Sequence, residues 1–488
     1  MNIISAMGDP TIFGKTFASS SWHAWRIALK AIFALPMNPS EVAIYQELTG
    51  RNTPPDDPAR EAWLVCGRRS GKSFMMALMA VYLACFRDYQ QYLAPGEVAT
   101  IFLVAADRKQ ARTTLRYIKG LLEVPLLAAL VEKSTEAGVE LRGRVAIEVA
   151  TCSSKTIRGY TLAAAICDEA AFWQDEGSVE PDREVLAALR PALSTIPGAL
   201  LLCASSPYAR KGILWDAYQR HFGRDGDPVL VFQAPTLRMN PTVPAGIIEE
   251  ARLADPQSAA AEYDAQFRSD VETFVVREAL DQCVTRGIRE RVPIASTRYV
   301  AFVDPSGGTS DAMVLAIAHA EKDGTAVLDA TVTRKSPFSP EQVVGDFATV
   351  LKRYRCAAVT GDHFGGDWPR EQFRKHGITY NVSQKTKRDL YLDVLPLINS
   401  GKADLLDDPR IAAEFCALER RRSRGGRDTI DHPLNAHDDF ANAVAGALCL
   451  AVEDAARSYI AFVPPVLIDP ADYPVGSSQF PWEQMNAP

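Results

Sequence analysis

The feature that most restricts the fold of this 488-residue chain is residues 66–73, which read Cys-Gly-Arg-Arg-Ser-Gly-Lys-Ser. An apolar run at residues 62–66 comes before it, and a helical pattern at residues 74–86 follows. This order indicates a phosphate-binding loop of the form G-x-x-x-x-G-K-[ST], with Cys66 in place of the first glycine. A Gly-Lys-Ser turn before an ordinary helix is the alternative interpretation.

A loop of this kind binds phosphate through its backbone amides and through the positive end of the helix that follows. We expect Lys72 to reach the β- and γ-phosphates of ATP, and Ser73 to ligate Mg²⁺. The predicted nucleotide-binding residues of this segment are Gly67, Arg68, Arg69, Ser70, Gly71, Lys72 and Ser73.

A second motif, Leu-Ala-Ala-Ala-Ile-Cys-Asp-Glu at residues 162–169, is an apolar strand that ends in two carboxylates. This pattern is typical of a Walker B motif. Asp168 is expected to hold Mg²⁺ through water, and Glu169 to activate the water that attacks the γ-phosphate. A strand that ends in a solvated acidic turn is the alternative.

Phosphoryl transfer also needs a positive charge at the transferred group. Arg68, Arg69 and Arg158 are candidates for such an arginine finger, although each could equally be a surface residue. Ser205 and Ser206 follow another apolar strand and could sense the γ-phosphate, or could simply form a turn.

The order of apolar and helical runs predicts the domain organisation. Residues 61–235 alternate between the two, which favours an α/β layer with a largely parallel sheet. The first forty residues resemble an arm or entry helix. We expect a P-loop ATPase domain of the ASCE type at residues 1–240, a connecting region at 241–295, a second domain at 296–456 and a Pro-rich tail at 457–488.

The second domain has a different order of elements. Strands are expected at residues 299–304, 312–320 and 325–333, joined by short glycine-containing turns that favour hairpins. A helix and two strands with intervening helices follow, then a helix at 411–422 and a last helix at 437–455. The order predicts an RNase H-like fold.

This topology should bring Asp304, at the end of the first strand, close to Asp362, at the end of the fourth, and to Asp438 before the last helix. Clustered carboxylates repel one another unless cations lie between them. Two Mg²⁺ or Mn²⁺ ions would satisfy them and could activate water for phosphodiester cleavage. Asp439 is a further candidate ligand. The alternative is that these aspartates are turn and N-cap residues.

Charge and composition exclude some classes of protein. The net charge of −7 excludes a histone-like protein that binds nucleic acid by bulk charge. Two basic clusters in the second domain could still follow a DNA backbone, or could be solvated helix ends; they contain Lys385, Lys387, Arg388, Arg420, Arg421, Arg422, Arg424 and Arg427. The nine cysteines form no C-x-x-C pair, which argues against structural zinc and for a reducing compartment.

No apolar stretch of the sequence is long enough to span a membrane.

Together these motifs resemble the large terminase subunits of tailed phages. The matching segments are residues 67–73, 157–172, 200–207, 299–308, 359–367 and 435–448. The resemblance implies an ATP-driven motor that moves double-stranded DNA into a procapsid, and a nuclease that cuts concatemeric DNA. It also implies a portal protein, a small terminase subunit and a ring of subunits as partners, in the cytoplasm of the host cell.

The resemblance also assigns roles to single residues. Arg158 matches an arginine finger that acts on the neighbouring subunit, Arg68 matches a recurring loop arginine, and Gln46 is a candidate for contact with adenine. Two other functions stay open: a nucleic-acid remodelling ATPase with an inactive nuclease-like domain, and a repair or recombination nuclease with a regulatory NTPase.

Overall fold

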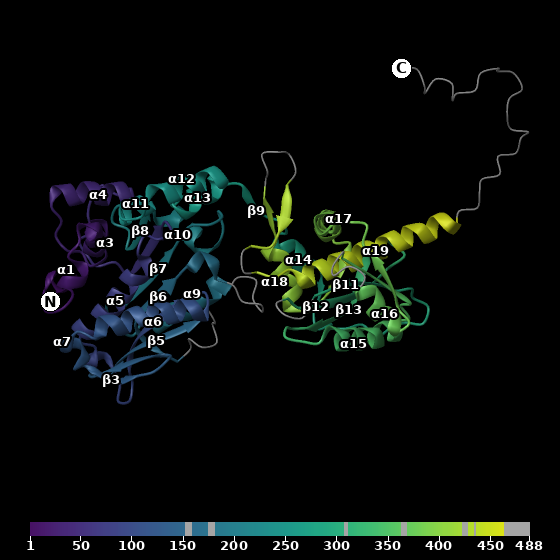
Figure 1. Cartoon of the computed structure of the whole chain (residues 1–488), viewed down its shortest axis with the longest axis horizontal. Helices are drawn as coiled ribbons and strands as arrows, with labels where there is room; N and C mark the ends of the chain where they lie inside the picture. Colours follow the sequence, from purple (N-terminus) through teal and green to yellow (C-terminus); the bar gives the residue numbers. More distant parts are fainter. Residues whose placement is uncertain are drawn as a thin grey trace, which may run out of the picture. The chain divides into compact units, whose positions relative to one another are not determined.

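The computed structural model describes residues 1–462 except 152–158, 174–180, 307–310, 363–367, 422–427 and 434–435. Its chain divides into two compact units (Figure 1). The first unit contains Met1–Asp281 and Asp408–Ala441, and the second contains Gln282–Asp407 and the chain from Asn442 onward. The division predicted at residues 240, 295 and 456 stays a prediction.

An eight-stranded sheet forms the centre of the first unit, in the order β3-β4-β5-β2-β6-β7-β1-β8. Its strands are β1 (Glu61–Cys66), β2 (Ala99–Ala105), β3 (Val131–Ser134), β4 (Gly138–Leu141), β5 (Val145–Thr151), β6 (Thr161–Asp168), β7 (Leu200–Ser205) and β8 (Val229–Ala234). Six neighbouring strands, from β5 to β8 in this order, are parallel. Strand β7 separates β1, which leads into the phosphate loop, from β6, which ends at Asp168. This confirms the predicted ASCE-type ATPase fold.

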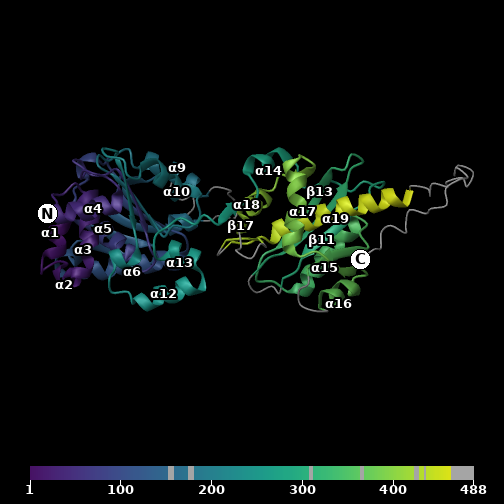
Figure 2. The same ribbon diagram turned by 90° about the horizontal axis from the view of Figure 1, so that it is seen from above.

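Alternate residues of each central strand face the two layers of helices. Ala62 and Leu64 of β1 join one core with helices α5 and α6, while Trp63 and Val65 join another with α9 and α10. Figure 2 shows α9 and α10 on the opposite side of the sheet from α6. The helices of the first unit are α1 (Ile3–Gly8), α2 (Gly14–Phe17), α3 (His23–Ile32), α4 (Pro39–Thr49), α5 (Lys72–Phe86), α6 (Arg108–Leu122), α7 (Pro125–Ala128), α9 (Pro181–Ala192), α10 (Gly212–His221), α11 (Thr236–Met239), α12 (Ala245–Ala254), α13 (Pro256–Glu262) and α18 (Pro409–Ala417).

Of the two expectations for the first forty residues, an arm or an entry helix, the arm is wrong, because this segment folds into helices that are part of the core. Ile3, Phe13, Phe17 and Trp25 are almost completely buried, and they belong to the same core as α5. Phe17 stacks on Phe74 of α5 at a centroid distance of 5.3 Å. The first helices are therefore an integral layer of the unit, because α5 is apolar around its whole surface and needs cover away from the sheet.

The second unit contains a seven-stranded sheet in the order β10-β16-β13-β12-β11-β14-β15. Its strands are β10 (Val284–Thr285), β11 (Val300–Asp304), β12 (Met313–Ala320), β13 (Ala326–Arg334), β14 (Ala358–Gly361), β15 (Thr379–Val382) and β16 (Ala403–Leu406). Strands β11, β12 and β13 form an antiparallel meander, and β14 lies parallel to β11. The predicted RNase H-like fold is confirmed.

Helices cover both faces of this sheet. Figure 1 shows α15 and α16 below the strands and α17 and α19 above them. The helices are α14 (Arg277–Cys283), which crosses the division between the units, α15 (Pro340–Arg353), α16 (Trp368–Lys375), α17 (Lys387–Asn399) and α19 (Asp439–Phe462). Residues 439–441 at the start of α19 belong to the first unit.

The prediction of a helix at residues 411–422 is wrong for its second half, residues 418–421. Helix α18 ends at Ala417, and Leu418 leaves the helical conformation with ψ at 137°. The chain continues as β17 (Glu419–Arg421), which pairs with β9 (Val271–Thr273) and β18 (Thr429–Asp431) in a three-stranded antiparallel sheet. Arginine is a good helix former, so the local sequence does not reveal this tertiary pairing.

Candidate nucleotide and metal sites

The phosphate loop connects the end of β1 to the first turn of α5. Arg69 and Gly71 have positive φ angles of 64° and 97°, which bend the loop back over the helix N-terminus. Gly67 has no room for a side chain, because a Cβ there would overlap Thr236 Oγ1 and lie 2.6 Å from the carbonyl oxygen of Tyr263. The loop conformation therefore depends on both glycines.

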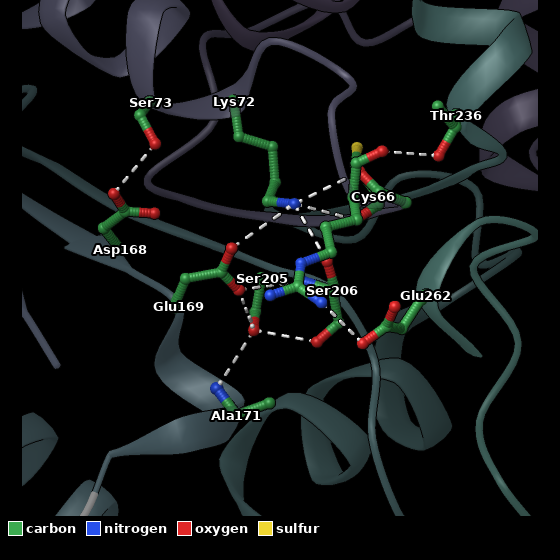
Figure 3. A network of polar contacts seen from close by, with 12 residues as sticks. Cys66, Lys72, Ser73, Asp168, Glu169, Ala171, Ser205, Ser206, Thr236 and Glu262 are labelled. Carbon is green, nitrogen blue, oxygen red and sulfur yellow. Dashed lines mark hydrogen bonds and ion pairs between the residues drawn. The ribbon is translucent and has the colours of Figure 1, made fainter. Parts of the chain in front are cut away.

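Lys72 lies at the centre of the site. Its ammonium donates to the carbonyl oxygens of Cys66 and Gly67, at 3.1 and 3.2 Å, and to Ser206 Oγ at 3.0 Å. Glu169 Oε1 lies 3.6 Å from the same nitrogen (Figure 3). The lysine is almost completely buried, so its charge acts in a region with little water.

Ser73 and Asp168 form the candidate Mg²⁺ site of the nucleotide. Ser73 Oγ donates to Asp168 Oδ2 at 3.1 Å, and Asp168 Oδ1 is buried with no hydrogen-bond partner among the described residues. Burial, with the charge of Glu169 second, raises the pKa of Asp168 to about 7. Ser73 Oγ and Asp168 Oδ1 lie close together, and hydroxyl and carboxylate oxygens are ligands that Mg²⁺ prefers. The residues therefore fit this ion.

Glu169, the residue that follows β6, faces Lys72. Its Oε2 accepts hydrogen bonds from Ser205 Oγ and from the backbone N–H of Ser206, both at 3.1 Å. Its backbone has a φ of 50°, a left-handed conformation that non-glycine residues seldom adopt. Ser205, the last residue of β7, and Ser206 thus contact the predicted catalytic carboxylate (Figure 3).

The remaining loop residues point elsewhere. The Arg68 guanidinium is exposed and pairs with Glu262 at 2.8 Å. The carbonyl of Arg69 accepts from Asn240 at 2.9 Å, and the carbonyl of buried Ser70 accepts from the Trp25 indole at 2.7 Å. These contacts support the loop backbone, and the finger role of either arginine stays a prediction.

Gln46 and Arg158 are the two remaining candidates for the nucleotide site. Gln46 is exposed on α4, and its amide donates to the carbonyl of Asn52 at 2.7 Å. Arg158 lies outside the described residues. Their predicted roles stay predictions.

Asp304 and Asp362 lie together in the second unit. Val303 of β11 pairs with Gly361 of β14 in parallel register, and the two aspartates are the next residues of the two strands. Both carboxylates act on Tyr380, where burial and then the charges of Asp362 and Asp304 raise the pKa. The predicted pairing of the first and fourth strands is therefore correct.

Asn442 is a residue of this site that sequence reasoning missed. It is completely buried on α19, and its amide donates to Asp362 Oδ2 at 2.7 Å. Tyr380 supports the same residue by donating to the carbonyl of Asp362 at 2.8 Å. Only its place one helical turn after Asp438 could have drawn attention to Asn442.

Asp438 and Asp439 belong to the first unit. Asp438 is almost completely buried, and with Asp431 and His432 it forms a group whose ligand atoms all lie within 4.8 Å of one another. His432 Nδ1 donates to the carbonyl of Pro433 at 2.9 Å, which leaves Nε2 3.9 Å from Asp438 Oδ1. Such a second hydrogen bond orients histidines that bind metals. A site that joins Asp304, Asp362 and Asp438 stays a prediction.

Glu414 of α18 is a second residue that the sequence did not suggest. Its Oε2 accepts from the backbone N–H groups of Phe440 and Ala441, at 2.7 and 3.0 Å. It therefore caps the free amides at the start of α19, the helix that Asp438 precedes.

Members of the basic clusters pair with nearby acids. Lys385 contacts Asp393 and Glu453, both at 2.5 Å, and Arg420 lies 2.7 Å from Asp428. Arg422, Arg424 and Arg427 lie outside the described residues. The DNA-binding role of these clusters stays a prediction. In the described part of the chain, no helix has both the length and the apolar character to cross a membrane.

Comparisons with known proteins give one family match and several solved structures of low identity. Residues 64–180 match the family described as terminase large subunit, T4likevirus-type, N-terminal. No curated protein matches the chain. The large terminase of bacteriophage HK97 is 16% identical, with 86% of this chain and 93% of that one covered and a TM-score of 0.37.

Two further solved structures, both from thermophilic phages, are similar at low identity. A large terminase in complex with ATP-gamma-S is 12% identical over 79% of this chain and 92% of that one, with a TM-score of 0.36. The large terminase nuclease of phage G20c, with bound magnesium, is 20% identical over 35% and 94%, with a TM-score of 0.31. Residues 64–180 of this chain are therefore similar to the N-terminal part of terminase large subunits of the T4likevirus type.

Proposed function

We propose that this chain is a DNA-packaging enzyme that hydrolyses ATP to move double-stranded DNA into a procapsid and cuts concatemeric DNA with a metal-dependent nuclease. The observation that carries the proposal is the contact of Lys72 with Glu169 beside the Ser73 and Asp168 pair. This is the residue set that positions and hydrolyses a nucleoside triphosphate with Mg²⁺.

In the proposed ATPase reaction, the loop amides and Lys72 bind the phosphates, and Ser73 and Asp168 hold Mg²⁺. Glu169 orients and deprotonates the attacking water, after it exchanges its contact with Lys72 for one with that water. Arg158 of a neighbouring subunit would supply the finger, and Arg68 would assist within the loop. This role for Arg158 implies a ring of subunits, assembled on a portal protein with a small terminase subunit.

In the proposed nuclease, Asp304 and Asp362 at adjacent strand ends would hold two Mg²⁺ or Mn²⁺ ions with Asp438 and Asp439. Adjacent carboxylates repel one another, and divalent cations relieve this repulsion. The ions would supply a hydroxide nucleophile and neutralise charge on the cleaved phosphate. Asn442 holds Asp362 in place.

The test uses the purified full-length chain with supercoiled plasmid DNA. We expect ATP turnover that rises with added DNA, and plasmid cutting that needs Mn²⁺ or Mg²⁺. Lys72→Ala should abolish turnover, because the phosphate loop loses its only lysine. DNA protected from nuclease inside cognate procapsids, in the presence of ATP, tests packaging itself.

The alternatives give other outcomes. Turnover without cutting at any metal concentration would assign the chain as a remodelling ATPase with an inactive nuclease-like domain. Preferred cutting of branched DNA, with no association with portal or procapsid, would assign a repair nuclease with a regulatory NTPase.

A further inference from the structure

The loop that follows β7 is attached directly to the nucleotide site. Ser206 contacts both Lys72 and Glu169, and Ser205 Oγ also accepts from the backbone N–H of Ala171 at 3.2 Å. A bound nucleotide draws Lys72 to its phosphates and Glu169 to the attacking water, so the contacts of Ser206 must change. The loop that follows β7 is therefore placed to respond to occupancy of the site.

Tyr208, two residues after Ser206, connects this loop to a second sheet. Its hydroxyl donates to Glu419 Oε2 of β17 at 2.5 Å, and its ring packs against Phe172, three residues after Glu169, at 5.6 Å. Burial, and then the charge of Glu419, raises the pKa of Tyr208, so the hydroxyl stays protonated and donates. The backbone is also fixed, because Arg268 N–H donates to the Tyr208 carbonyl at 2.8 Å.

Glu419 is a completely buried carboxylate and depends on its donors. Besides Tyr208 it has Lys211 Nζ at 2.8 Å and Arg421 Nη2 at 3.4 Å. Leaving a buried carboxylate with one donor fewer costs free energy, so a shift of the Tyr208 hydroxyl favours a matching shift of Glu419 and β17.

Strand β17 leads in turn to the candidate metal group of the first unit. Glu419 lies opposite Asp431 in the register of β17 and β18. Arg421, which lies 3.4 Å from the Tyr208 hydroxyl, also donates to the carbonyl of His432 at 3.3 Å. His432 faces Asp438 at 3.9 Å. The contacts from Glu169 towards Asp438 thus run through backbone and side-chain groups of Ser206, Tyr208, Glu419, Arg421 and His432.

We propose that Tyr208 and Glu419 couple the nucleotide site to the segment that carries His432 and Asp438, so that ATP occupancy regulates the nuclease. This inference rests on the proposed function. Its physical basis is one buried hydrogen bond between an ATPase loop and a strand that precedes the metal group. Neither residue belongs to the proposed ATP-binding or metal-binding set, so both are positioning residues.

The test compares the full-length chain with Tyr208→Phe and Glu419→Gln. Tyr208→Phe removes only the hydroxyl and keeps the ring against Phe172. Tyr218→Phe is the matched control, because its hydroxyl donates to Gln233 in the same unit at 3.0 Å. Hydrogen exchange of peptides that contain β17 and β18 is measured with and without ATP-gamma-S, and plasmid cutting in Mn²⁺ is measured under both conditions.

We expect ATP-gamma-S to change exchange in these peptides at least twofold in the unsubstituted chain and in Tyr218→Phe. In Tyr208→Phe and Glu419→Gln, both this change and the nucleotide dependence of cutting should disappear, while ATP turnover of Tyr208→Phe stays within twofold. An unresponsive hairpin in the unsubstituted chain, or an equal response in Tyr208→Phe, would overturn the coupling. Absence of ATP turnover in the unsubstituted chain would instead contradict the proposed function.

Discussion

Asn442 shows how a single amide can fix a carboxylate of the proposed nuclease site. Its Nδ2 atom donates to Asp362 Oδ2 and restricts the rotation of that carboxylate. Groups that hold metal ligands in place commonly change metal affinity about 10–100-fold when removed. The amide is therefore as much part of the proposed nuclease site as the aspartates.

Replacement of Asn442 with Ala should weaken Mn²⁺ binding by roughly 10-fold or more, because Asp362 loses the partner that orients it. Isothermal titration of the nucleotide-free chain with Mn²⁺ measures this affinity. Asn381→Ala, at an exposed position of β15 in the same sheet, is the matched control. Equal Mn²⁺ affinity in the two variants would exclude the positioning role of Asn442.

At the scale of an element, the packing of helix α19 on the sheet depends on the absence of a side chain at Gly446. Helix α19 packs its glycine directly on the ring of Phe302 in β11, where an added Cβ would overlap three ring atoms. A long helix can therefore approach the sheet closely beside Asp304 and Asp362.

The substitution Gly446→Ala should destabilise the second unit by about 1–3 kcal/mol, because overpacking forces the helix or the ring to move. Gly345→Ala is the control: its Cβ would meet His376 at 3.5 Å, an ordinary contact, and alanine favours helix α15. Urea unfolding, followed by fluorescence, measures the free energy of unfolding of the two variants. A neutral Gly446→Ala would show that the helix does not constrain this sheet.

The sequence predicted the elements whose residues carry local signals. The phosphate loop, the strand that ends at Asp168 and the meander of β11 to β13 all followed from apolar runs bounded by glycine or aspartate. Strand β17 was mistaken for helix, because its conformation comes from pairing with β9, a strand far earlier in the chain. Contacts such as Tyr208 to Glu419 leave no local pattern, so only the folded structure reveals them.

A buried ion pair gives the whole molecule a pH-dependent contribution to stability. His319 Nδ1 lies 2.6 Å from Asp329 Oδ2, and both side chains are buried in the second unit. Burial alone would lower the pKa of His319, but the hydrogen bond and charge of Asp329 outweigh it and raise that pKa above its ordinary value of 6.5. The folded chain thus binds this proton more tightly than the unfolded chain.

The contribution of the pair is therefore complete below about pH 6.5 and is lost as pH rises through the raised pKa of folded His319. His319→Gln should cost about 1–3 kcal/mol at about pH 6 and clearly less at about pH 9. Thermal unfolding at the two pH values measures this difference, with His376→Gln as the control. An equal cost at both pH values would mean that the histidine is neutral in the folded chain.

The central claim is that one chain carries two separate reaction centres, one for ATP hydrolysis and one for DNA cutting. The most direct test measures ATP turnover and Mn²⁺-dependent plasmid cutting on the same preparations of Glu169→Gln and Asp304→Asn. We predict that Glu169→Gln lowers ATP turnover at least ~100-fold while cutting without nucleotide persists, since a general base contributes on this scale. Asp304→Asn should abolish cutting and leave turnover intact. Full ATP turnover in Glu169→Gln, or unimpaired cutting in Asp304→Asn, would contradict the account.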